Sequence, residues 1–442
     1  MLIRKLSALI AIFTAFSFGQ SSKNVINLNK AIEMALQRNI TVLQSKNTVE
    51  SQQSTYQSAI GGLLPNLNAS GSFNRTQSWQ DVTGLLGDQT LFSARNLYSS
   101  GISSNVTLFN GFANIANVNR SNSNIRSSEY SYERVKQNII YQTHQLFLNV
   151  VRTHQLLKVN EENLKRSSRQ LERIEEMNRV GAISLADVYR QRVTTGNDEL
   201  ALINAQNNFE KAKADLTLFL SIETDATYDF DVSEVSIEVD TSEFVLINAK
   251  YQDKTALAKK AIESRPDYQS TTQNVRSAQS SLTIARSGLY PIVSANASYG
   301  LSDKEFAKIS DNRSLSTGVT LSLPIFSGFQ TKNAIEQAII TQRNADDLLK
   351  QNERQISVDI QKAQLDIEAA QKQVKVTQAS VFSAEMDRKI AEEKYNLGAG
   401  TLLDLLIASA NYINAQSNQV NAAISYLLSK KQMEYALGTI SN

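Results

Sequence analysis

The feature that most constrains this chain is an internal repeat with a fixed offset. Gly181 is matched by Gly398 and Asp187 by Asp404, each 217 positions further on. The same offset relates the segment 109–112 to 326–329, which both contain Phe at each end and Gly third. An offset that persists over about seventy residues without a gap indicates one duplicated structural unit, whose two copies need the same length.

A glycine in each copy interrupts a very long helical run. Between Phe329 and Leu397 the chain contains no Pro and no Gly and is rich in Ala, Gln, Lys and Glu, which favour helix. Gly398 and Gly400 can adopt a positive φ, and Thr401 can cap a following helix. The segment, and its copy around Gly181, therefore predicts a tight reversal between two antiparallel helices.

The expected helices come in three lengths. Two long helices, at about 111–180 and 328–397, would each measure roughly 100 Å at 1.5 Å per residue. We expect return helices at 184–220 and 401–437 and leading helices at 27–60 and 254–287, with a cap at Asn29, an interruption at Arg38–Asn39 and a new start at Pro266. One leading and one return helix placed end to end match one long helix, which predicts a cylinder about 100 Å long.

Alternating segments follow Pro65 and Pro291, where the leading helices stop. Apolar and small polar residues take opposite sides, which predicts four strands in two hairpins, 67–73 with 102–108 and 293–301 with 315–323. The polar sides carry Ser, Asn, Thr and Gly, where a soluble sheet usually carries Lys and Glu, so the wall of a transmembrane barrel is favoured. We expect long polar hairpin loops at about 80–97 and 302–313, across the membrane from the helices.

Four strands cannot close a barrel, since the smallest membrane barrels have eight. An open sheet in lipid would leave edge N–H and C=O groups unpaired, at several kcal/mol each. Several copies must then share one barrel, with eight strands from two copies or twelve from three. Twelve strands leave a lumen, whereas side chains fill the interior of eight. A conduit therefore favours three copies, although the strand count alone leaves both numbers open.

Composition shifts divide the rest of the chain. Residues 1–19 begin with Arg4 and Lys5 before an apolar run, which predicts a signal peptide, because about thirteen apolar residues are too few for a membrane anchor. The segment 223–253 is acidic and rich in Val, Ile and Thr, and we expect a small strand-containing insert there, at mid-length. The two repeats then span 20–222 and 254–442.

The chain lacks the residues that several classes of function require. The chain has no cysteine, and its formal charge of +2 falls to about zero without the signal peptide, which gives no reason to expect nucleic acid. His144 and His154 are ten residues apart, too far along a helix to share a metal. Without a convergent acid pair or a nucleophile triad, we expect neither an enzyme nor a cofactor.

These features together resemble the TolC-like outer-membrane efflux family over essentially the whole mature chain. The most specific segments are 395–404 and 180–187, two matched glycine turns that each have Asp six residues after Gly, with 436–439 near the end. The resemblance implies a homotrimer that shares a 12-stranded barrel in the outer-membrane lipid and extends a helical tunnel through the periplasm. It implies a passive conduit, opened by untwisting of its tips, that serves a periplasmic adaptor and an inner-membrane pump of the RND, ABC or a similar class.

The resemblance also assigns candidate residues at the tunnel tip. Adaptor docking would use the two turns, which consist of Val180, Gly181, Ala182, Leu397, Gly398 and Ala399. Asp404 would form an aspartate ring at the aperture, while Asp187 and Tyr395 would make contacts that hold the tip closed. Ile407 stands where the family has a second aspartate, and Gly400 where it has the arginine of a closing salt bridge. From position alone, either aspartate could simply complement a helix N-terminus.

A second interpretation belongs to another class of protein. A secreted or surface coiled-coil structural protein could also combine long helices with terminal hairpins and transport nothing. It should carry charges on both strand faces and stay soluble, whereas a conduit should need detergent and migrate as a trimer.

Overall fold

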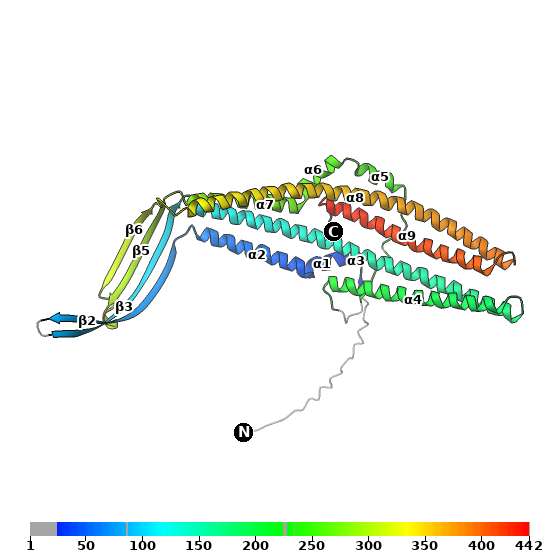
Figure 1. The fold of residues 1–442 in the computed structure, drawn as a ribbon, viewed down its shortest axis with the longest axis horizontal. Coiled ribbons are helices and arrows are strands. Elements are labelled where there is room, and N and C mark those ends of the chain that lie inside the picture. The colour runs from blue at the N-terminus through cyan, green and yellow to red at the C-terminus, as the bar shows by residue number, and fades with distance from the viewer. Residues whose placement is uncertain (1–23, 85–86, 224–227, 234, 442) are drawn as a thin grey trace, which may run out of the picture.

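The computed structural model describes residues 24–84, 87–223, 228–233 and 235–441. The predicted signal peptide at 1–19 lies outside these residues. The described part is elongated (Figure 1). A β-sheet lies at one end, two tight turns that connect antiparallel helices lie at the other, and helices run along the length between them. The prediction of a mainly α chain with a small β part and long duplicated helices is confirmed.

The long helices of the two repeats are equal in length, and so are the return helices. The long helices α3 (Ala113–Arg179) and α8 (Gln330–Asn396) have 67 residues each. The return helices α4 (Leu185–Phe219) and α9 (Leu402–Ala436) have 35 each. All four pairs of bounds differ by the same 217 positions, so the offset seen in the turns extends over the whole of both hairpins. At 1.5 Å per residue each long helix measures roughly 100 Å, as predicted.

Each leading helix is a stacked pair rather than one rod. The pairs are α1 (Leu28–Arg38) with α2 (Ile40–Gly61), and α6 (Lys254–Ser264) with α7 (Pro266–Ser287). The predicted breaks at Arg38–Asn39 and Pro266 are confirmed. The predicted cap is wrong: Asn27, with an extended backbone, accepts from Lys30 N–H at 3.0 Å, and Asn29 lies inside α1.

Polar side chains join the stacked helices end to end. Asn39 caps α2 by accepting from Thr41 N–H at 2.9 Å, and its Nδ2 donates to the carbonyl of Phe219, the last residue of α4, at 3.1 Å. In the second repeat, Arg265 Nη1 donates to the last carbonyl of α9, that of Ala436, at 3.3 Å. These bonds satisfy carbonyls that the helix ends would otherwise leave unpaired.

The helices form a single curved layer. In the half near the sheet, α3 packs between α2 and α7, and α7 packs on α8. In the other half, α3 packs between α4 and α9, and α9 packs on α8. The cores are thin and lie mainly near mid-length; one is centred on α1, α3 and α4, with Phe147, Val150 and Leu216 fully buried. The other joins α5, α6, α8 and α9 around Ile356, Ala363 and Met433.

The sheet continues this layer in the same order. Strands β2 (Asn66–Gly84), β3 (Gly87–Asn110), β5 (Ile292–Asp303) and β6 (Arg313–Ser322) are antiparallel in the order β2-β3-β5-β6, which repeats the helix order α2, α3, α7, α8. Among the described residues, the outer edges of β2 and β6 pair with no strand. The sheet is therefore open on both sides.

The two hairpins differ from the prediction and from each other. A loop at 80–97 was expected, but β2 and β3 stay paired through Trp79 and Phe92 to Gly84 and Gly87, and the Trp79 and Phe92 rings lie 5.4 Å apart. Aromatic cross-strand pairing thus extends the ladder through a polar stretch. The loop expected at 302–313 is confirmed apart from strand residues at its two ends, and it contains the short turn η1 (Phe306–Lys308).

The insert at 223–253 mixes both kinds of structure. Strand β4 (Tyr228–Phe230) pairs in parallel with β1 (Asn24–Ile26), as a strand-containing insert predicts. The insert also contains the helix α5 (Glu243–Lys250), which was not predicted and which lies along α8 near mid-length (Figure 1). None of the helices in the described ranges is both long enough and apolar enough to cross a membrane.

Candidate functional site at the helix tips

The two turns at the far end of the layer have the same backbone. Gly181 and Gly398 adopt φ of 77° and 72°. After α3, Ala182 N–H donates to the Met177 carbonyl and Gly181 N–H to that of Asn178, both at 2.9 Å. After α8, Ala399 N–H donates to the Lys394 carbonyl at 2.9 Å and Gly398 N–H to that of Tyr395 at 3.1 Å. This pattern is a Schellman motif, which requires a left-handed residue and therefore favours glycine.

A capped helix follows each turn. Thr401 and Asp404 form a capping box, in which Thr401 Oγ1 accepts from Asp404 N–H and Asp404 Oδ2 accepts from Thr401 N–H, both at 3.2 Å. Thr401 Oγ1 also donates to Asp404 Oδ2 at 2.6 Å. Hydrogen bonds from Thr401 hold the pKa of the exposed Asp404 carboxyl below its usual value. Ser184 caps α4 by accepting from Asp187 N–H at 3.3 Å, and its Oγ donates to Asp187 Oδ2 at 2.8 Å. Each aspartate is thus fixed at a helix N-terminus by its own cap.

Asp187 and Tyr395 lie close together although they come from different repeats. Ile174, Val188 and Leu402 are buried in one apolar cluster, against which Ile183, Tyr395 and Leu406 pack. Burial raises the pKa of Tyr395, and the negative charge of Asp187 raises it further. The Tyr395 hydroxyl is buried and has no hydrogen-bond partner among the described residues. The cluster therefore joins the two helical hairpins just behind their turns.

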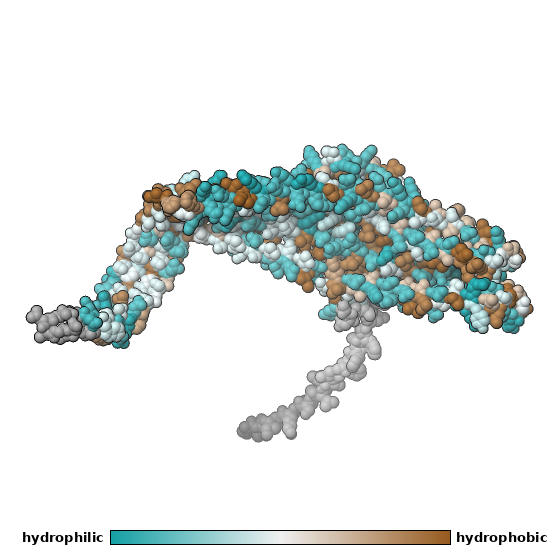
Figure 2. Space-filling view, in the orientation of Figure 1, coloured by the Kyte–Doolittle hydropathy of each residue, from teal (hydrophilic) through white to brown (hydrophobic). Residues whose placement is uncertain are grey.

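The outward side of the tip is apolar and open. Val180 is 71% exposed and Leu397 83%, although both are large apolar side chains. Leu185, Leu403 and Ile407 in the first turns of the return helices are more than half exposed. A Cβ added at Gly181 or Gly398 would meet no atom within 4 Å. Apolar residues also gather at the tip in the view of Figure 2. Such a surface suits contact with another protein.

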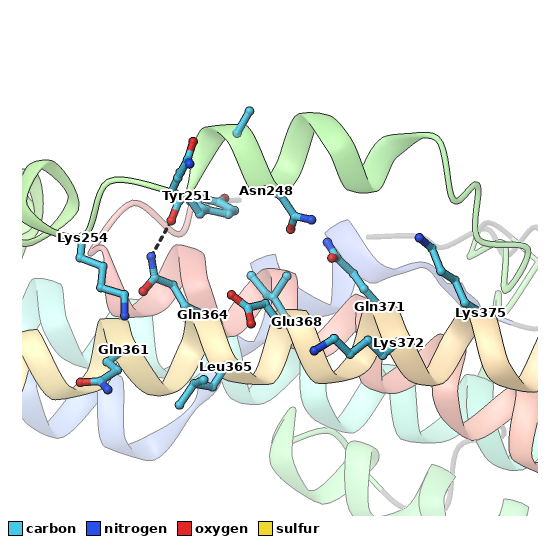
Figure 3. Close-up of a pocket in the computed structure, with 13 residues that line it drawn as sticks. Asn248, Tyr251, Lys254, Gln361, Gln364, Leu365, Glu368, Gln371, Lys372 and Lys375 are labelled. Carbon is cyan, nitrogen blue, oxygen red and sulfur yellow. Dashed lines mark hydrogen bonds between the residues drawn. The ribbon is translucent and has the colours of Figure 1, made fainter.

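A second candidate is a polar groove at mid-length, between α5 and α8. It has a volume of about 600 Å³, and Lys254, Lys372 and Lys375 line it together with Glu368. Figure 3 shows side chains of α8 that point toward α5, among them Gln371. Gln371 is only 6% exposed, and its Nε2 donates no hydrogen bond within the described part of the chain. The described lining of the groove carries cations and amides, and Glu368 supplies its one carboxylate.

Both histidines pack within the helix layer. Burial, with the charge of Lys431, lowers the pKa of His144 to about 4, so it stays neutral at physiological pH. The His154 ring packs 5.2 Å from the ring of Phe209. Over residues 24–84, 87–223, 228–233 and 235–441, no three His, Cys, Asp or Glu side chains gather as metal ligands.

Several polar contacts within each repeat were not predicted from the sequence. The caps Ser184 and Asn39 are two of them, although the spacing Ser-x-x-Asp before a helix was a signal for the first. Arg265 is another; it is 3% exposed, and its guanidinium lies 2.6 Å from Asp267 and 3.0 Å from Asp359. No pattern in the sequence pairs Arg265 with a carboxylate 94 positions away.

This architecture, a sheet at one end and duplicated long-helix hairpins with capped turns at the other, defines a tunnel-type outer-membrane channel. Residues 31–221 and 257–439 match the family model described as outer membrane efflux protein, and the chain belongs to that family.

Its relatives and structural neighbours agree. Outer membrane protein TolC of Vibrio cholerae is 22% identical over 443 residues, which cover 98% of this chain and 96% of that protein. TolC of Escherichia coli is 21% identical over 86% of this chain and 75% of its own length. The Campylobacter jejuni CmeC outer membrane channel superposes with a TM-score of 0.78 at 19% identity, over 93% of this chain and 85% of that one. The outer membrane protein VceC of Vibrio cholerae gives 0.77 at 18%, over 93% and 96%. The predicted family, the outer-membrane location and the role as an outer-membrane efflux channel are confirmed.

Proposed function

We propose that three copies of this chain close one barrel and one helical tunnel, and that this tunnel exports substrates delivered by a periplasmic adaptor and an inner-membrane pump. The open sheet is the observation that carries the proposal. Its edge strands β2 and β6 pair with no strand among the described residues. In lipid each unpaired edge group costs several kcal/mol, which neighbouring chains would remove. Three such sheets give twelve strands, enough for a lumen.

The edges of the helix layer support the same assembly. Large apolar side chains recur along the outer edge helix α8, where Ile340, Leu348, Leu365 and Val376 are 55–64% exposed. The opposite edge helix α4 exposes Tyr189, Val193, Leu200 and Ile203 to a similar extent, 55–65%. One edge of a chain could bury its row against the other edge of the next chain. Burial of both rows would contribute at roughly 25 cal/mol per Å² of apolar surface.

The tip would serve both as gate and as docking surface. Val180, Gly181 and Ala182 with Leu397, Gly398 and Ala399 would meet the adaptor, because this surface is apolar and uncovered. Three Asp404 carboxylates around an axis would attract cations and repel one another. Within each chain, the hydrogen bonds from Thr401 lower the pKa of this carboxyl and favour its charged form. Packing of Tyr395 near Asp187 would hold the two hairpins of one chain together while the aperture is closed.

Single-channel conductance of the purified protein in planar bilayers tests the conduit and its gate. We expect trimeric protein to form pores that divalent cations block, and Asp404→Asn to weaken that block. Asp347→Asn is the matched control, since it removes an exposed carboxylate from α8 far from the tip. Equal block in all three proteins would remove Asp404 from the aperture. If the protein instead stays monomeric and soluble without detergent, and shows no conductance, the interpretation as a structural coiled-coil protein is favoured.

Cross-linking tests the docking surface. The chain has no cysteine, so a single cysteine introduced at Val180, Leu397 or Asn248 can be cross-linked only at that position. We expect cross-links to the adaptor from the first two positions and none from Asn248, which lines the mid-length groove. Cross-links from Asn248 alone would place the adaptor at the insert and contradict tip docking.

A further inference from the structure

A cationic cavity lies within the helix layer, behind the tip. It has a volume of about 320 Å³ and is lined by α3, α4, α8 and α9. Its lining includes Leu405 and Leu406, which directly follow Asp404, and Leu406 also packs against the apolar tip cluster. The two repeats thus meet at this cavity.

Arginine dominates the charge of the cavity. Four arginines line it, against the two carboxylates of Asp198 and Glu392; they are Arg166, Arg169, Arg173 and Arg388. Arg388 lies 2.8 Å from Glu392, and Arg166 lies 3.6 Å from Glu162 in its own helix. Asp198 accepts from Asn163 Nδ2 at 2.8 Å. Arg169 and Arg173 form no ion pair within the described part of the chain, so the lining keeps an excess of positive charge.

Several polar atoms in this lining are buried and unpaired. Arg166 Nη2, Arg388 Nε and Gln170 Nε2 are N–H donors with no acceptor among the described residues. A buried donor left unsatisfied costs about 1–3 kcal/mol, and more when it is charged. The lining also holds one unpaired buried acceptor, Gln191 Oε1, so the donors are in excess and point to a ligand that supplies acceptors.

Tyr412 of α9 fixes the arrangement of the two guanidinium groups. The Arg166 guanidinium carbon lies 5.7 Å from the centre of its ring and that of Arg388 lies 5.3 Å away. Gln416 Nε2 donates to the Tyr412 hydroxyl at 3.0 Å, which holds the ring in place. The ring thus positions a guanidinium from each repeat before any ligand arrives.

We propose that this cavity binds a small organic anion through its carboxylate or phosphate oxygens. The Arg166 and Arg388 N–H groups and the Gln170 amide donate to those oxygens, as arginine does in bidentate recognition of such groups. A volume of about 320 Å³ exceeds what a bare halide fills and lies at the small end of ligand pockets. Because α3 and α8 belong to different repeats, the bound anion links the two hairpins behind the tip.

Calorimetric titration of the full chain, purified in detergent, tests the site with two probes. Citrate represents the carboxylates and inorganic phosphate represents the phosphates, each at an ionic strength matched with sodium chloride. We expect saturable binding of one anion per chain for at least one probe, and affinities at least tenfold lower in Arg166→Gln and Arg388→Gln. Arg354→Gln, on an exposed face of α8, is the matched control and should bind as the native protein does.

Two further variants separate loss of the site from loss of the fold. Arg388→Lys keeps the charge but removes the Nε donor, so we expect intermediate affinity. Gln170→Leu removes a donor without changing charge, and it too should weaken binding while the thermal melt by circular dichroism stays cooperative. Absence of saturable binding to either probe in the native protein overturns the proposal. So does native affinity in both Arg166→Gln and Arg388→Gln.

Discussion

Two glycines at the corners between sheet and helix offer a matched test of backbone strain against crowding. Gly111 and Gly328 occupy the same place in the two repeats and adopt φ of 61° and 59°. Alanine at either would bear the left-handed penalty of roughly 1–2 kcal/mol. Only at Gly111 would the new Cβ collide, at 2.8 Å from both the Ser287 carbonyl oxygen and Tyr290 Cβ. At Gly328 it would meet nothing within 4 Å.

The collision sets the size of the difference. Ser287 contributes backbone atoms, which cannot swing aside as a long side chain can, so an overpacking cost of about 1–3 kcal/mol adds to the strain. We expect Gly111→Ala to destabilise by about 2–5 kcal/mol and Gly328→Ala by about 1–2 kcal/mol. Urea unfolding in detergent, followed by circular dichroism, measures both on otherwise identical chains. Equal destabilisation would show that crowding by α7 does not determine the cost, and the reasoning would fail.

Three other predictions concern buried polar groups. His144 has a folded pKa of about 4, below its ordinary 6.5. The free energy of unfolding should therefore be about 3 kcal/mol higher above pH 6.5 than at pH values below 4, and this difference is lost as the pH falls from 6.5 toward 4. His144→Gln should flatten that part of a curve of stability against pH. Arg265→Ala should cost about 3 kcal/mol in unfolding free energy because two partly buried carboxylates lose their ion pairs with Arg265, and adding Asp359→Asn should restore part of it. Tyr395→Phe should leave the thermal midpoint unchanged or raise it, since the buried hydroxyl has no partner among the described residues; a clear loss would reveal a contact from a neighbouring chain.

Helices and turns were predictable because their signals are local. The breaks after Arg38 and before Pro266 and the glycines at 181 and 398 each depend on a few adjacent residues. The loop at 80–97 failed for the opposite reason. Trp79 finds Phe92 only across the strand pair, so a polar stretch remains in the ladder. The end of β6 at Ser322 was missed by one residue, because Pro324 has no N–H to donate and ends the pairing early.

Of the candidate site, the turns were predictable and their surroundings were not. The matched glycines located the tip to the residue, but the packing of Tyr395 against Val188 and Leu402 depends on how the two repeats meet. The arginine-lined cavity is the extreme case. Arg166 and Arg388 are 222 positions apart, and in the sequence each is one charge among many on a helix that reads as solvated. They belong to one site only because both guanidinium groups lie against the Tyr412 ring of α9.

The two repeats also show where the length of the chain is constrained. Before the hairpins, equivalent residues such as Ile40 and Pro266 lie 226 positions apart, but after them Ala113 and Gln330 lie 217 apart. The first β-hairpin is therefore nine residues longer, and all nine fall between the start of its first strand and the corner at Gly111. In the helical hairpins, by contrast, every helix begins and ends 217 positions after its counterpart in the first repeat. A change of one residue there would rotate a turn by about 100° and move its capped aspartate along the layer by 1.5 Å. Length is therefore fixed where the two turns must end side by side, and free at the hairpin tips, where nothing in the helix layer depends on it.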